Sequence, residues 1–194
     1  MSNPFFIGFD IETRPRADLV ERFAKPFPDF DPDAVKMGNL KDEAKRAAKL
    51  EEAKQEHEQE RLAYWRKLKD DAALNPHTAE VLCIGTITDK GDIDIISKAT
   101  ERETIEEFWA IVRLAETATT KWVFWSGTGG SAKFDLDMLV TRSRILGIRV
   151  PWQVRQPGSR FYNSSFIDLA AEFLLHQRER YLSLTRAADL CGLY

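Results

Sequence analysis

The sequence is poor in the residues on which secreted and zinc-binding domains depend. Its 194 residues include two cysteines, Cys83 and Cys191, and three histidines. Two cysteines form neither a disulfide framework nor a zinc pattern. His57 and His77 each stand alone in the sequence, so we assign neither to a metal site. The composition therefore predicts a protein of the reducing cytoplasm.

Long apolar runs and a large excess of either charge are absent as well. No apolar run approaches 18 residues, and the N-terminus lacks a basic start followed by a long apolar segment. We therefore expect neither a membrane span nor a signal peptide. The net charge of −3 excludes a generally basic surface, so any contact with nucleic acid must be local. The length is that of one domain with a sizeable core, which we expect to span residues 1–194.

The most informative segment is residues 5–13, which read Phe-Phe-Ile-Gly-Phe-Asp-Ile-Glu-Thr. This apolar run, followed by the turn-like Arg14-Pro15-Arg16, predicts a buried strand. Side chains alternate along a strand, so Asp10 and Glu12 share one face and lie about 6.5 Å apart. A hard divalent cation would offset the repulsion between the two carboxylates. Two alternatives stay open: the strand end is solvated, or Arg14 and Arg16 neutralise the pair.

The middle of the chain predicts alternating helices and strands. Four prolines between residues 15 and 32 indicate a loop with a short helix near residues 17–23. Residues 41–70 are rich in Ala, Glu, Lys, Gln and Arg, which predicts a long solvated helical insertion docked through its C-terminal third. Further predicted elements are strands at 81–88, 93–97 and 121–125, a hairpin turn at 89–92, and a helix after the capping box Thr100–Glu103.

A second acidic pair opens the helix predicted at residues 133–146. Its buried arc contains Phe134, Met138, Leu139, Ile145 and Leu146. Asp135 falls inside this arc and Asp137 outside it. From its place in the first turn alone, Asp135 is as readily a helix-capping acid as a ligand. The glycine-rich residues 126–131 that precede the helix lack the Gly-Lys-Ser/Thr of a phosphate-binding Walker loop.

The C-terminal part predicts one more strand and two helices. The strand covers residues 161–167 and has Asp168 at its end, where this acid can cap a helix at 169–177. Ser183 is the expected N-cap of the last helix, residues 183–190. The basic residues Lys121, Lys133, Arg142 and Arg144 are either solvated surface charges or contacts to phosphate.

Together, Phe9-Asp10-Ile11-Glu12-Thr13 and Lys133-Phe134-Asp135-Leu136 resemble the first two motifs of the DEDD superfamily of 3′–5′ exonucleases. More narrowly, the chain resembles proofreading-type exonucleases related to those of family B polymerases, from about Phe5 to the C-terminus. The resemblance implies an α/β fold: a ribonuclease H-like mixed β-sheet flanked by helices. The usual Asn before the second motif is missing, and residues 126–131 stand in its place.

The resemblance also implies a function, a site and partners. It implies two-metal hydrolysis of terminal phosphodiesters of DNA or RNA, with two Mg²⁺ or Mn²⁺ ions and a single-stranded 3′ end as substrate. The implied catalytic and metal-binding residues are Asp10, Glu12 and Asp135. The implied nucleic-acid-binding residues are Thr13, Ser126 and Phe134.

The third motif of that superfamily, Tyr-x-x-x-Asp or His-x-x-x-x-Asp, is not found. Tyr162, His176 and Tyr181 are followed at the required spacing by Phe, Tyr and Thr. We therefore expect the chain to end just short of this motif, as a fragment, a truncated product or a protein whose last acid comes from elsewhere. Asp168 and Asp189 remain candidates for a fourth acid within the chain. The competing hypotheses are a catalytically incomplete nuclease-like module that binds nucleic acid or protein, and a structural domain with solvated acids.

Overall fold

The computed structural model describes residues 5–39, 42–115, 120–125, 134–155, 165–170 and 183–192. Five strands form one mixed sheet in the order β3-β2-β1-β4-β5. β1 is antiparallel to β2 and parallel to β4, which is in turn parallel to β5. The strands are β1 Phe5–Pro15, β2 Ala79–Thr88, β3 Ile93–Ile96, β4 Thr120–Phe124 and β5 Phe166–Asp168. This confirms the expected α/β class, and the sheet is compatible with a ribonuclease H-like fold.

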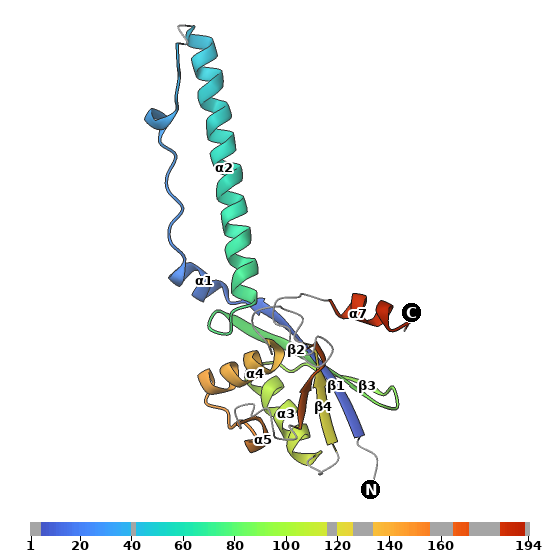
Figure 1. Ribbon diagram of the computed structural model, residues 1–194. Helices are drawn as coiled ribbons and strands as arrows, with labels where there is room; N and C mark the ends of the chain where they lie inside the picture. The colour runs from blue at the N-terminus through green and yellow to red at the C-terminus, as the bar shows by residue number, and fades with distance from the viewer. Residues whose placement is uncertain are drawn as a thin grey trace.

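Helices occupy the connections between these strands except for the β2–β3 hairpin (Figure 1). The predicted capping box is present at Thr100, whose hydroxyl accepts from the Glu103 amide while the Glu103 side chain accepts from the Thr100 amide. The predicted turn before β3 contains Gly91 at a φ of +85°, a left-handed conformation that favours glycine. The helices are α1 Ala17–Phe23, the 3₁₀ turn η1 Pro32–Ala34, α2 Glu43–Ala73, α3 Glu101–Leu114, α4 Phe134–Ile145, α5 Trp152–Arg155 and α7 Leu184–Leu190.

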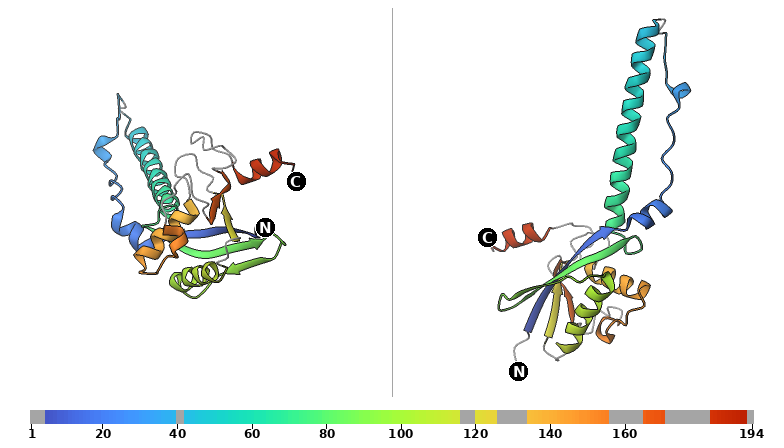
Figure 2. Two further views of the ribbon diagram at one scale, coloured as in Figure 1. Left: turned by 60° about the horizontal axis from the view of Figure 1, so that its bottom comes forward. Right: turned by 180° about the vertical axis from the view of Figure 1, so that it is seen from behind.

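The core lies on one face of the sheet. Ile7, Phe9 and Ile11 of β1 are buried there, as the alternation in the sequence predicts. α3 covers this face (Figure 2), and the ring of its Phe108 lies 5.3 Å from that of Phe9. Ile145 was expected on the buried arc of α4 but is exposed. It is the last residue of the helix, and the next residue, Leu146, packs against the core in its place.

The segment that connects β1 to β2 in the chain forms a long arm, which projects from the sheet (Figures 1 and 2). It leaves after Pro15 and returns before Ala79, and these two residues face each other in the β1–β2 ladder. α2 is about 46 Å long at the usual helical rise, and only its Ala72 is buried. At the base, the Thr13 hydroxyl donates to the Ala73 carbonyl at 2.7 Å. The expected solvated helix is therefore present and is docked through its C-terminal end. No helix in the described ranges is both long and apolar enough to cross a membrane.

The extended chain before α2 is held against the helix by aromatic contacts. The Phe27 ring lies 5.1 Å from the His57 ring and 5.3 Å from the Tyr64 ring. The Tyr64 hydroxyl donates to the Lys25 carbonyl at 2.7 Å, and His57 Nε2 lies 3.1 Å from the Pro28 carbonyl oxygen. These contacts lie far from the sheet, so they order the arm without contributing to the core.

Phe27→Ala is expected to release this extended segment from α2 at a cost of about 1 kcal/mol or less in the free energy of global unfolding. Amide hydrogen exchange should quicken at residues 25–30 and stay unchanged in β1 and β2. Phe23→Ala is the matched control, because the Phe23 side chain is exposed. A loss of several kcal/mol in Phe27→Ala would show instead that the arm and the sheet unfold as one unit.

Candidate active site

The carboxyl ends of β1, β4 and β5 meet at one edge of the sheet, because the three strands run parallel. This edge is the usual ligand site of open α/β sheets. Pairing of β1 with β4 ends at Gly8 opposite Val123, and β1 then continues beside β2 alone. Asp10 and Glu12 lie on this continuation, and both are exposed on the face opposite the core. The ladder with β2 shifts register between Glu12 and Thr13, an irregularity common beside active sites.

The two arginines that follow do not serve these carboxylates. Arg14 forms its ion pair with Glu80, and Arg16 pairs with Asp18 at 2.7 Å. Neutralisation of Asp10 and Glu12 by these arginines, one of the alternatives from the sequence, is therefore not what the structure shows.

Asp135 is the buried member of the acidic group. It lies in the first turn of α4 and only 5% of its surface is exposed, whereas Asp137 is exposed. Burial, followed by the negative charges of Asp10, Asp168 and Glu12, raises the pKa of Asp135 to about 7. Three carboxylates, two from β1 and one from the end of β5, therefore act on Asp135 at the start of α4.

Asp168 is the acid whose place the sequence left most open. It is the last residue of β5 and lies opposite Phe124 of β4. It is buried, and its carboxylate accepts a hydrogen bond from the Ala170 amide at 3.0 Å. Asp189, the other candidate for a fourth acid, is exposed on α7 and is not among the charges that raise the pKa of Asp135. The sequence left both acids open, and the signal that could have separated them was the place of Asp168 at the end of a predicted strand.

The remaining predicted residues have varied surroundings. The Thr13 hydroxyl is engaged with Ala73 at the base of the arm. Phe134 is half-buried and packs against the core. Ser126 and Lys133 lie outside the described residues. The interpretation of Arg142 as a surface charge or phosphate contact is wrong, because this side chain is fully buried and paired with Glu101.

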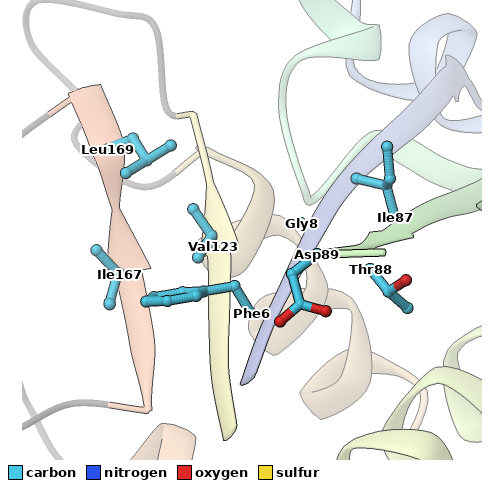
Figure 3. A pocket seen from close by; sticks show the side chains of 8 residues that line it. All are labelled: Phe6, Gly8, Ile87, Thr88, Asp89, Val123, Ile167 and Leu169. Carbon is cyan, nitrogen blue, oxygen red and sulfur yellow. The ribbon is translucent and has the colours of Figure 1, made fainter. Parts of the chain in front are cut away.

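An apolar cavity lies beside Gly8 of β1 (Figure 3). Because side chains alternate along a strand, Gly8 is on the same face as Asp10 and Glu12. The volume of the cavity is about 350 Å³. Gly8 forms part of its floor, and a Cβ at this position would come within 2.9 Å of the Ile87 Cγ2 atom. Any larger residue at position 8 would therefore displace Ile87. The apolar side chains that line the cavity belong to Phe6, Ile87, Val123, Ile167 and Leu169.

The donor set suits a hard divalent cation, because carboxylate oxygens are the ligands that Mg²⁺ prefers. A cation would also relieve the cost of ionising the buried Asp135 among three other acids. In the described part of the chain, no three His, Cys, Asp or Glu side chains are grouped so that they could hold a metal ion together. The chemistry of the group therefore fits a metal, and binding would have to draw the carboxylates closer.

Comparison with known proteins gives one informative match. No family model and no curated protein matches this sequence. The structure of the family B DNA polymerase from the hyperthermophilic archaeon Pyrobaculum calidifontis matches the whole chain with a TM-score of 0.51 and 16% sequence identity. This likeness concerns the fold. The chain spans 19% of the length of that polymerase.

Proposed function

We propose that this chain is a metal-dependent 3′–5′ exonuclease that hydrolyses the terminal phosphodiester of single-stranded DNA or RNA. The observation that carries the proposal is the buried Asp135 beside Asp10, Glu12 and Asp168 at the carboxyl edge of the sheet. Two further points support it: the resemblance of residues 9–13 and 133–136 to nuclease motifs, and the fold likeness to a DNA polymerase.

In this proposal the carboxylates have separate roles. Asp10 and Glu12 are exposed and would meet both the cations and the substrate. Asp135 is buried and would complete the ligand set from the helix side. Bound Mg²⁺ or Mn²⁺ would supply an activated water and stabilise the leaving oxygen. Without a cation, the acidic edge repels a phosphodiester, so we expect nucleic acid to bind there only when metal is present.

A second candidate function is binding without catalysis. It is favoured by the absence, within the described ranges, of three acidic, His or Cys side chains grouped to hold a metal. In that case the chain would be a nuclease-like module that binds nucleic acid or a protein and does not cut.

The deciding experiment measures release of nucleotides from 3′-labelled single strands of DNA and RNA with Mg²⁺, Mn²⁺ or EDTA. We expect release with metal, a fall to the EDTA level in Asp10→Asn, and little change in Asp137→Asn. Binding by the folded wild-type protein without release would favour the second candidate. Release that persists in Asp10→Asn would place the chemistry elsewhere and overturn the proposed site.

A further inference from the structure

Arg142 is a buried cation on the helix that carries Asp135. None of its surface is exposed. Its guanidinium donates from Nε and Nη2 to the two carboxylate oxygens of Glu101 at 2.8 and 2.6 Å. Nη1 donates to the Pro76 carbonyl at 3.1 Å. This planar fork therefore joins α4 to the start of α3 and to the base of the arm, a geometry that lysine cannot reproduce.

Glu101 extends the connection to the strands. Its Oε1 atom also accepts the Val81 amide at 2.9 Å. Val81 lies opposite Thr13 in the β1–β2 ladder, at the register shift next to Glu12. Hydrogen bonds thus run from Arg142 through Glu101 to Val81 of β2, the residue that pairs with Thr13 of β1 in the ladder.

Arg142 and Asp135 lie on nearly the same face of α4. The two residues are seven positions apart, which is about two helical turns. A change in the tilt or rotation of α4 at Arg142 would therefore also displace Asp135 relative to β1.

We propose that Arg142 is a positioning residue: it sets the place of Asp135 relative to the carboxylates of β1 by fixing α4 to Glu101. The expected effect of Arg142 on metal affinity rests on the proposed function. Its role in holding α4 in place relative to β1 does not. Outer groups that orient metal ligands commonly change metal affinity about 10–100-fold when removed. We expect a loss of Mn²⁺ affinity in that range for Arg142→Gln and a smaller loss for Arg142→Lys.

Ser143 provides a matched control on the same helix. It is equally buried, accepts the Trp109 indole N–H at 2.8 Å and donates to the Leu139 carbonyl at 2.6 Å. These contacts connect α4 to α3 and do not reach β1 or β2. Ser143→Ala therefore removes a buried polar contact between the same two helices while leaving the link to the strands intact.

The test combines hydrogen exchange of the metal-free protein with Mn²⁺ titration. Arg142→Gln should quicken exchange both in residues 134–140 and in residues 9–15, whereas Ser143→Ala should affect only residues 134–140. If Arg142→Gln does not fold, Arg142→Lys and Glu101→Gln replace it. The proposal would be overturned if exchange in residues 9–15 were equal in the Arg142 and Ser143 variants. It would also be overturned if the wild-type protein bound Mn²⁺ and Arg142→Gln bound it with the same affinity. A wild-type protein without any Mn²⁺ response would instead count against the proposed function, and the exchange data would still decide the role of Arg142.

Discussion

Asp135→Asn is expected to stabilise the metal-free protein at pH 8 and to remove its response to divalent metal. The expected gain is on the order of 4 kcal/mol in the free energy of unfolding, because burial and three neighbouring acids raise the pKa of this carboxyl from 3.8 to about 7. Asparagine keeps the shape of the side chain and carries no charge. Its effect on stability and its effect on metal binding should therefore have opposite signs.

The pH dependence follows from where the proton is held. Below about pH 4, Asp135 is protonated in both the folded and the unfolded protein, so its ionisation costs nothing. Between pH 4 and 7 the unfolded chain has released the proton that the folded protein still binds, and the wild-type protein loses stability as the pH rises. Above about pH 7 both states are ionised and the full cost is present. The difference between Asp135→Asn and wild type should therefore grow from pH 4 to 7 and then level off.

Urea unfolding from pH 4 to 9, with EDTA and with excess Mn²⁺, measures both effects. Mn²⁺ should stabilise the wild-type protein by mass action and leave Asp135→Asn unchanged. Asp137→Asn is the control, since this exposed acid lies in the same helical turn and should change stability by about 1 kcal/mol or less at any pH. A variant of Asp135 that is no more stable than wild type at pH 8 would mean that its carboxylate is already compensated in the metal-free protein.

Local features of the fold could be predicted from the sequence because they depend on neighbouring residues. The two faces of β1 follow from strict alternation, the start of α3 from the Thr100–Glu103 box, and the turn before β3 from Gly91. The burial of Asp135 followed in the same way from helical periodicity. In each case the physical cause lies within a few residues of its effect, so no knowledge of the sheet order was needed.

The rest of the site could not be predicted because it depends on contacts between distant segments. Asp168 joins the acidic group only because β5 pairs with β4, which pairs with β1. The partners of Arg142 are Glu101 and Pro76, which are 41 and 66 residues away in the sequence. A signal for Arg142 was nevertheless present: it lies seven residues after Asp135 and therefore on the same inward face of the helix. A cation at such a position indicates a buried partner more often than a surface contact.

Phe9→Ala is expected to cost about 3–5 kcal/mol in the free energy of unfolding, the usual range for removing a fully packed phenylalanine. The Phe9 ring lies between 5.3 and 6.4 Å from those of Phe108, Phe124, Phe166 and Trp122. These rings come from α3, β4 and β5, so the cavity left by the variant would loosen the same strands that position Asp10 and Asp168. We therefore expect any metal response to weaken together with stability.

Phe6→Ala separates this effect from a general effect of apolar residues in β1. Phe6 lies three positions earlier on the opposite face, where 39% of its surface is exposed, and its truncation should cost about 1 kcal/mol or less. Phe9→Leu, which keeps most of the volume, should recover most of the loss. Calorimetric unfolding of the three variants tests the assignment of faces directly. Equal losses for Phe6→Ala and Phe9→Ala would mean that the outer face of the sheet is covered in solution, and that Asp10 and Glu12 are less accessible than their exposure indicates.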